Sequence, residues 1–178
     1  DTKGYYSSEI NPKFKALYEE NSDIIGWITI DGTNIDYPVM QNKDDGEFYL
    51  RKGFNKSYSR EGSIFADENS SIEYGKETKN IMLYGHHMVS TGTMFKELDK
   101  FQSIDFYKEH PTVTFDTLYR DSEYKVFAVF ITNAIESQDN GNIYNYRQTE
   151  FSSEKDFDEW INEARTRSLI TTDVTIDY

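Results

Sequence analysis

Three histidines, His86, His87 and His110, carry the acid–base chemistry that the sequence offers near neutral pH. An imidazole has an unperturbed pKa of about 6.5, so it can both accept and donate a proton under physiological conditions. The chain contains no cysteine, and residues 1–178 therefore supply no thiolate nucleophile, no disulfide and no thiolate metal ligand. A histidine acting as general acid and base is the chemistry that these residue types favour.

The spacing of the histidines argues against a metal site. His86 and His87 are neighbours, and on a strand their side chains point to opposite faces, so one ion could bind both only across a bulge. His110 precedes Pro111 in a turn-like segment, where a polar surface side chain is expected. The sequence has no glycine-rich phosphate loop, no GxSxG and no HExxH pattern. We therefore predict neither a metal nor a cofactor.

His86 lies near the end of the most informative stretch, NIMLYGHH at residues 80–87. The first half of this stretch is apolar on both faces and the second half is polar, as in a central strand that delivers side chains to a surface. We expect His86 to act there as a general acid and base, although a histidine satisfied by its neighbours fits the spacing as well. The nucleophile stays open among serine, threonine, lysine, tyrosine and carboxylates, and Ser90 is merely close in sequence.

The elements that position His86 are predicted to be mostly strands. Residues 124–132 are apolar on both faces, which predicts a buried strand. The final residues alternate apolar and polar types, which predicts a strand that stops at Tyr178 without a turn signal. Runs of β-branched and aromatic residues predict the other strands, at residues 27–30, 35–40, 62–67, 80–87 and 112–117.

Three helices are expected at the periphery. Asn11 as N-cap and Pro12 in the first turn predict a helix over residues 11–23, within an N-terminal helical segment, residues 1–25, that packs on the sheet. Thr93 is expected to cap a short helix that reaches residue 101. A third helix is predicted over residues 152–168 from apolar residues at helical spacing and a capping box, namely Phe157, Trp160, Ile161 and Ala164 with Ser153 and Asp156.

Together these elements predict a mostly β fold with peripheral helices, a barrel or sandwich in a single domain, because strands and helices do not alternate regularly. The net charge of −13 opposes binding to nucleic acid and to anionic membrane surfaces. The longest apolar run covers only residues 126–131, whereas a membrane helix needs about 20 residues. The first residues lack the features of a signal peptide, so we expect any membrane anchor to lie upstream.

Several long blocks of the chain follow one another in the order of a known family. They are LYEENSDIIGWITIDGTNIDYPVMQ, FYLRKGFNKSYSREGSIFAD, NIMLYGHHMVSTGTMFKELDKF and FYKEHPTVTFDT, followed by the region from Phe157 to Val174. These blocks resemble the class B sortases, cysteine transpeptidases on the surface of Gram-positive bacteria. The helix expected at residues 152–168 is similar to the long inserted helix that distinguishes class B from class A sortases.

The resemblance implies a closed barrel of eight β-strands, about six of them in this chain, with a histidine, a cysteine and an arginine at the active site. His86 matches the catalytic histidine of the family. Tyr146 and Arg147 match a segment that lines the substrate groove, although Tyr146 fits an ordinary exposed loop tyrosine equally well. The implied reaction cleaves an Asn-Pro-x-Thr-like sorting signal of surface proteins through a cysteine acyl-enzyme, which a cell-wall peptide amine or a pilin lysine resolves at the extracellular face of the cell membrane.

The chain departs from the family because the catalytic cysteine and arginine match positions downstream of Tyr178. We therefore expect residues 1–178 to be a C-terminally incomplete sortase-like domain that is inactive by itself. Two strands would then be lacking, and the strand at residues 80–87 would become an edge. Two alternatives stay open: a non-catalytic sortase-like module that binds peptides, and a hydrolase that pairs His86 with a serine.

Overall fold

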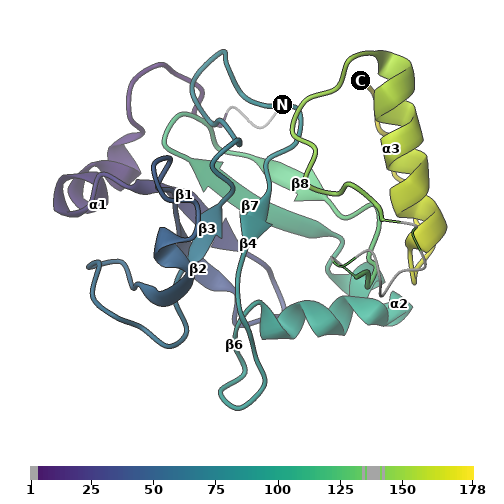
Figure 1. The fold of residues 1–178 in the computed structure, drawn as a ribbon, viewed down its shortest axis with the longest axis horizontal. Coiled ribbons are helices and arrows are strands. Elements are labelled where there is room, and N and C mark those ends of the chain that lie inside the picture. Colours follow the sequence, from purple (N-terminus) through teal and green to yellow (C-terminus); the bar gives the residue numbers. More distant parts are fainter. Residues whose placement is uncertain (1–3, 134, 136–140, 142) are drawn as a thin grey trace.

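The structure is a computed structural model that describes residues 4–133, 135, 141 and 143–178. Its main feature is a six-stranded sheet with the strand order β4-β3-β2-β1-β7-β8 (Figure 1). At its centre, β1 (Ile24–Thr29) pairs antiparallel with both β2 (Asp36–Met40) and β7 (Thr112–Thr117). The turn between β1 and β2 contains Gly32, whose positive φ of 75° suits a residue without a side chain.

The two edges of the sheet are short. β3 (Ile64–Ala66) runs parallel to β2, and β4 (Leu83–Tyr84) pairs with it at one edge. β8 (Glu123–Lys125) pairs with β7 at the other edge, and its residues are exposed. The sheet curls into half of a barrel, which confirms the predicted mostly β fold. Within the described part of the chain, neither β4 nor β8 has a strand on its outer side.

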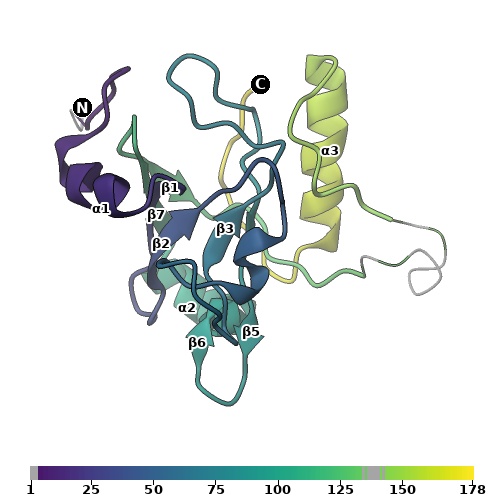
Figure 2. The same cartoon turned by 60° about the vertical axis from the view of Figure 1, so that its left-hand side comes forward.

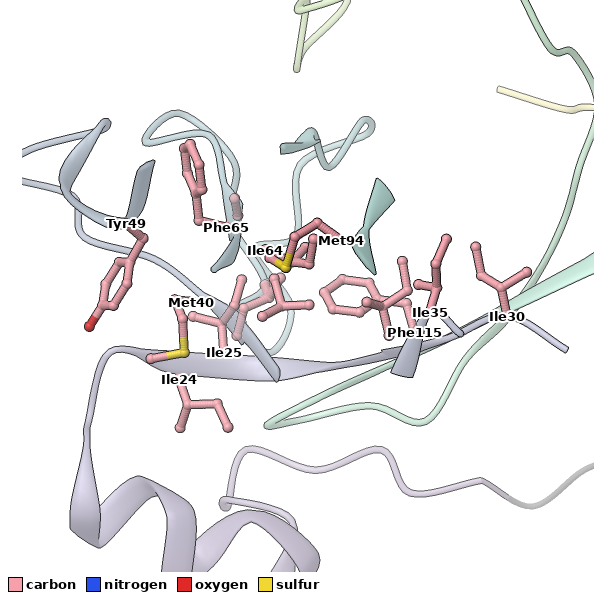
Figure 3. Close-up of a cluster of buried hydrophobic side chains, with 14 of the residues drawn as sticks. Ile24, Ile25, Ile30, Ile35, Met40, Tyr49, Ile64, Phe65, Met94 and Phe115 are labelled. Atoms are coloured by element: carbon pink, nitrogen blue, oxygen red, sulfur yellow. The ribbon is translucent and has the colours of Figure 1, made fainter. Parts of the chain in front are cut away.

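Most of the core lies on one side of the central strands, where β-branched residues meet methionine and aromatic side chains, while Ile24 lies on the other side (Figure 3). Each large apolar side chain buried here contributes about 1.5–3 kcal/mol of transfer free energy. Tyr49 is 1% exposed, and its hydroxyl is satisfied because it accepts from Asn21 Nδ2 at 2.9 Å and donates to Asp23 Oδ2 at 2.8 Å. The most completely buried aliphatic residues are Ile24, Ile35, Val39, Met40 and Ile64.

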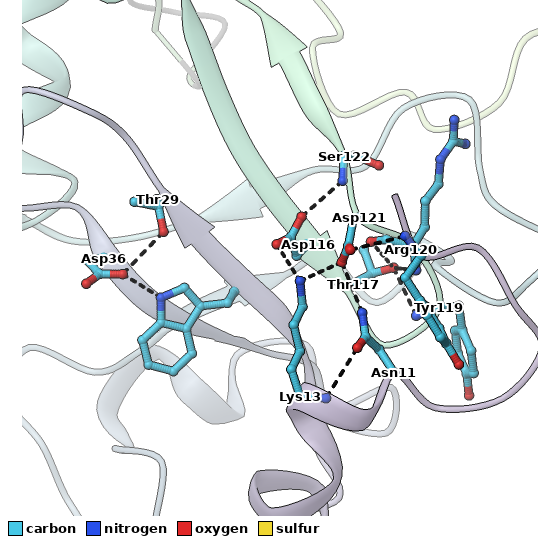
Figure 4. A network of polar contacts seen from close by, with 12 residues as sticks. Asn11, Lys13, Thr29, Asp36, Asp116, Thr117, Tyr119, Arg120, Asp121 and Ser122 are labelled. Atoms are coloured by element: carbon cyan, nitrogen blue, oxygen red, sulfur yellow. Dashed lines mark hydrogen bonds and ion pairs between the residues drawn. The ribbon is translucent and has the colours of Figure 1, made fainter. Parts of the chain in front are cut away.

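The N-terminal segment packs on the sheet, but its helix is shorter than predicted. A 3-10 turn (Pro12–Phe14) capped by Asn11 leads into α1 (Lys15–Glu20), which ends at an extended Asn21. Phe14 enters the core, and Lys13 reaches the β7–β8 turn, where its ammonium pairs with Asp116 and Asp121 (Figure 4). The helix stops at Glu20 because the Asn21 side chain turns inward to bind Tyr49 rather than continuing the helical face.

The other helices lie at the periphery of the sheet (Figure 2). α3 (Glu154–Arg167) confirms the predicted capping box, since Ser153 Oγ accepts from the Asp156 backbone N–H at 3.2 Å. The expected cap at Thr93 is wrong, because Thr93 pairs with Met88 in a small hairpin. That hairpin consists of β5 (His87–Met88) and β6 (Thr93–Met94). It leads into a 3-10 helix (Phe95–Gln102) and then into α2 (Ile104–Glu109). Earlier in the chain, a separate 3-10 turn covers Phe48–Arg51.

The strand predicted at residues 80–87 is reduced to β4. β4 ends just before Gly85. The chain passes closely over β3 at this point, because a Cβ added at Gly85 would lie 2.4 Å from Ile64 Cδ1. The carbonyl of His86 then accepts from the Phe95 backbone N–H at 2.9 Å, outside the sheet. The ladder therefore stops two residues before His86, and the chain turns into the β5–β6 hairpin.

The strand predicted at residues 124–132 is also wrong beyond Lys125. The backbone of this stretch bonds to segments that are not strands: Val126 N–H donates to Pro111 O at 2.9 Å, and Val129 O accepts from Leu169 N–H at 2.7 Å. The final residues, 172–178, form no strand either, although Ile176 reaches an apolar groove. Alternating apolar residues in both stretches therefore reflect partial burial without strand pairing. No helix among the described residues is long and apolar enough to cross a membrane.

Candidate active site

His86 lines a pocket of about 540 Å³ beside the end of β4. The pocket wall includes Phe65 and Tyr84, which are register partners on β3 and β4, and Arg147 from the loop before α3. Carboxylates gather on the same wall, at Asp45, Glu47, Asp67 and Glu68. The strand end thus brings one imidazole, one guanidinium and several carboxylates around a single cavity.

The His86 ring is half-buried, and its Nδ1 atom is buried without a hydrogen-bond partner in the described part of the chain. A buried polar atom left unpaired costs about 1–3 kcal/mol, so such atoms call for a functional explanation. The alternative of a histidine fully satisfied by its neighbours therefore does not hold at Nδ1. The ring lines the cavity while Nδ1 is shielded from it, so Nε2 is the ring nitrogen left to exchange a proton with a bound group.

The other two histidines lie elsewhere. His87 is exposed, and its Nε2 atom is 2.8 Å from Asp99 Oδ2. His110 packs its ring against Phe106, with the ring centroids 4.6 Å apart. Neither lines the pocket of His86. Among the described residues, no group of three or more histidine or acidic side chains is arranged to hold a metal ion.

The structure brings Arg147 to the pocket of His86 but places Tyr146 behind it. The Arg147 guanidinium carbon is 5.7 Å from the ring centroid of Tyr84 and also 5.7 Å from that of Tyr146. The contact with Tyr146 is the main cause that raises the pKa of Arg147, so the guanidinium stays charged. Of the two substrate-binding residues predicted from the sequence, Arg147 thus lines the cavity and Tyr146 supports it.

Asp67 and Tyr84 belong to the same wall, and sequence reasoning did not single them out. Tyr84 Oη donates to Asp67 Oδ2 at 2.8 Å, while Asp67 Oδ1 accepts from the backbone and side chain of Asn69. Burial alone would raise the pKa of Asp67, but these hydrogen bonds and the charge of Arg147 hold it below its usual range. Tyr84 ends β4 two residues before His86, and both residues line the same pocket.

The loop that carries Arg147 is held by hydrogen bonds to Asn80 and to α3. Asn80, just before β4, donates from its backbone to Thr149 O at 3.0 Å and from its side chain to Gln148 O at 2.8 Å. Gln148 in turn donates to Asp156 Oδ2 at 3.2 Å, in the first turn of α3. The N-terminus of α3 and the approach to β4 therefore hold Arg147 over the pocket.

A second cavity, of about 660 Å³, lies between the sheet and α3. Its wall is mainly apolar, and it includes Leu83 of β4, Phe115 of β7, Ile161 of α3 and Ile176. This apolar groove contains no histidine, although Glu77 Oε1 is buried there without a partner among the described residues. The groove is larger than the pocket of His86.

Comparison with known proteins shows the family to which this fold belongs. The sortase domain family matches residues 28–172. The chain is 32% identical to sortase B of Staphylococcus aureus over 171 residues, which are 96% of this chain and 65% of that protein. It is also 32% identical to sortase B of Listeria monocytogenes over 170 residues, 96% of this chain and 64% of that protein. The chain thus spans slightly less than two thirds of the length of these curated relatives.

Solved structures agree with the sequence relatives. The structure of a Staphylococcus aureus sortase B–substrate complex matches with a TM-score of 0.84 and 33% identity, covering 95% of this chain and 73% of that one. Sortase B from Bacillus anthracis, in complex with AAEK1, matches with a TM-score of 0.81 and 32% identity, covering 98% and 78%. The chain belongs to the sortase family, and its structural neighbours are class B sortases.

Proposed function

We propose that this chain is the histidine-bearing part of a class B sortase, a transpeptidase that cuts a sorting signal and joins it to an amine. The observation that carries the proposal is the position of His86, beside a cavity and with Nδ1 uncommitted. Membership of the sortase family supports the reaction class. Because residues 1–178 contain no cysteine, the thiol nucleophile is proposed to come from outside them.

In the proposed reaction the thiolate attacks the Thr carbonyl carbon of an Asn-Pro-x-Thr-like signal and forms a tetrahedral intermediate. The C–N bond then breaks, and His86 gives a proton to the leaving amine, which leaves a thioester. An acceptor amine attacks the thioester, loses a proton to His86 and releases the thiolate. A cation beside the oxyanion lowers the barrier of both steps. No arginine of this chain is assigned that role.

The peptide is proposed to bind at Arg147, which lines the pocket, and at the neighbouring Tyr146, whose ring contacts the guanidinium. The substrate complex of the Staphylococcus aureus relative supports peptide binding by this fold. The acceptor is proposed to be a cell-wall peptide amine or a pilin lysine, and the place of action the extracellular face of the cell membrane, with any membrane contact through an upstream anchor. Nucleic acid is not a proposed partner, because the net charge is −13.

The experiment compares residues 1–178 with the product of the complete gene, using an Asn-Pro-Gln-Thr peptide. Residues 1–178 should give no turnover, whereas the complete protein should cleave the peptide. His86→Ala should abolish that cleavage, because removing the acid–base partner of a thiol nucleophile costs several orders of magnitude in rate. His87→Ala is the matched control, since His87 lies outside the pocket. Turnover by residues 1–178, lost in His86→Ala, would contradict the thiol mechanism.

The absence of cysteine from residues 1–178 favours a second candidate, a non-catalytic module that holds sorting peptides. The two candidates differ in one measurable property of the complete protein. A module would bind the peptide without cleaving it and would show no thiol that reacts with an alkylating probe. Cleavage blocked by thiol alkylation would exclude the module.

A further inference from the structure

We infer that Asp67 is a positioning residue for peptide binding: through Tyr84 it holds the Arg147 guanidinium in place to bind acceptor oxygens of the sorting peptide. The inference rests on the proposed function of the pocket and adds a device to it. The device comprises the Asp67 carboxylate, the Tyr84 phenol and the Arg147 guanidinium, which come from three separate segments of the chain.

The first step of the argument is the position of Arg147 among acids. Besides His86, it is the only basic side chain on the described wall of the pocket, where Asp45, Glu47 and Glu68 also lie. The ion pairs of the described residues nevertheless include none between Arg147 and these three carboxylates. The guanidinium carbon instead lies 5.7 Å from the ring centroids of both Tyr84 and Tyr146. A guanidinium has five N–H donors, so these ring contacts leave donors for a ligand.

The second step is the rigidity of Asp67. Both of its carboxylate oxygens are engaged, Oδ2 by Tyr84 and Oδ1 by Asn69. Its backbone is held as well, because its N–H donates to Met82 O at 2.9 Å and its carbonyl accepts from Gln41 Nε2 at 2.7 Å. Asp67 is therefore a fixed point, and its negative charge attracts the guanidinium that covers the Tyr84 ring.

The third step is the position of the Tyr84 ring. Its ring lies 5.4 Å from the ring of Phe65, its cross-strand partner, and 5.7 Å from the Arg147 guanidinium carbon. With the phenol tied to Asp67, the ring cannot rotate away from either neighbour. Fixing a long side chain before the ligand arrives lowers the entropy cost of binding. The surrounding carboxylates repel an anionic ligand, so the acceptors are amide carbonyl oxygens of the peptide.

The chain offers a matched control for this device. Tyr49 donates to Asp23 Oδ2 at 2.8 Å, the same chemical pair at the same distance as Tyr84 and Asp67. Tyr49 is buried in the core, and neither Tyr49 nor Asp23 lines the pocket of His86. Asp23→Asn therefore reports what the loss of a tyrosine–aspartate pair does to the fold alone.

One measurement tests the positioning without any enzymatic assay. In the complete protein, the Arg147 Nε–H signal is followed by ¹⁵N NMR and identified by its loss in Arg147→Lys. We expect a narrow, dispersed signal in the wild type that shifts to the position of free arginine in Asp67→Asn and Tyr84→Phe. The signal should stay in place in Asp23→Asn. An unchanged signal in Asp67→Asn would overturn the inference, whatever the pocket binds.

A second measurement tests the link to the peptide. Asp67→Asn should raise KM for an Asn-Pro-Gln-Thr peptide about tenfold and change kcat less than about twofold, because it removes binding shared by the ground and transition states. Arg147→Lys should have a similar effect, and the double variant should be no worse than Arg147→Lys. Additive effects, or an equal loss in kcat, would overturn the inference. A wild-type protein that ignores the peptide would refute the proposed function, and the NMR result would still decide the positioning.

Discussion

The centre and the edges of the sheet differ in how their backbone groups are paired. β1 has a strand partner on both sides, and its residues are largely buried. β4 and β8 have a partner on one side only within the described residues, and the apolar groove lies beside both. His86 follows the end of one such edge. The comparison shows that the site stands where sheet pairing stops, so its geometry depends on side-chain contacts such as those of Asp67 and Tyr84.

The largest expected effect concerns the edges themselves. Unpaired strand edges beside an exposed apolar surface favour pairing with another chain. We therefore predict that residues 1–178, expressed alone, self-associate or unfold without cooperativity. Light scattering with intact-mass measurement and urea unfolding test this. A monodisperse 20.9 kDa monomer with a single steep transition would show that the two edges need no partner.

A smaller effect is expected on the free energy of unfolding when a glycine of the central strand and a glycine next to the edge strand are each replaced by alanine. A Cβ added at Gly26 of β1 would lie 2.3 Å from the Asp116 carbonyl oxygen, whereas at Gly85 it would meet the side chains of Ile64 and Phe95. The backbone of a strand paired on both sides cannot move, whereas the end of the Ile64 side chain can shift. Gly26→Ala should therefore lower the free energy of unfolding by about 3 kcal/mol and Gly85→Ala by about 1 kcal/mol.

Urea unfolding of the complete protein measures both values. Gly53→Ala serves as the control, since the nearest atom to its added Cβ is 3.6 Å away, and it should change stability by less than about 0.5 kcal/mol. Equal losses at Gly26 and Gly85 would show that the end of β4 is as rigid as the centre, which would remove the distinction drawn here.

The smallest expected effect is an acid-sensitive loss of stability at the contacts of Asp121 with Lys13, Tyr5 and Asn11, which we call the N-terminal clasp. Burial would raise the pKa of Asp121, but hydrogen bonds from Lys13, Tyr5 and Asn11 hold it below its usual value. Because the folded pKa lies below the unfolded value of about 3.9, the stabilisation is present above about pH 4 and is lost as the pH falls through the folded pKa. Asp121→Asn should flatten the acid limb of the stability curve by less than about 1 kcal/mol.

The measurement is the free energy of unfolding from pH 2 to 6. Asp36→Asn is the control, because Asp36 accepts from Trp27 and Thr29 on the sheet, away from the clasp, as Figure 4 shows. A steeper acid limb in Asp121→Asn than in the wild type would contradict the linkage argument.

Local patterns predicted the elements whose signals are contained in a few neighbouring residues. The Ser153 cap and the helical spacing of Phe157 and Ile161 were sufficient for α3. The strands at residues 80–87 and 124–132 were overextended, because an apolar pattern reports burial and does not identify the partner that buries it. The sequence predicted that His86 would lie near the end of a strand that reaches a surface, whereas β4 ends at Tyr84 and His86 lines a cavity beside that end. The catalytic role of His86 stays a prediction.

The missed residues depend on contacts between distant segments. Asp67 meets Tyr84 only because β3 and β4 pair in the register Phe65↔Tyr84. Arg147 reaches them because Asn80 and α3 hold its loop. No local pattern contains that information, and a tyrosine two residues before a candidate catalytic histidine was the only signal in the sequence.

The central claim is that the pocket of His86, rather than the apolar groove, binds the sorting peptide. Titration of the complete protein with an Asn-Pro-Gln-Thr peptide, followed by backbone amide NMR, tests it most directly. The account predicts that the amides of Tyr84, His86 and Arg147 shift with a common saturation curve, while the amide of Ile161, on the wall of the groove, stays in place. Saturable shifts at Ile161 with none at His86 would contradict it.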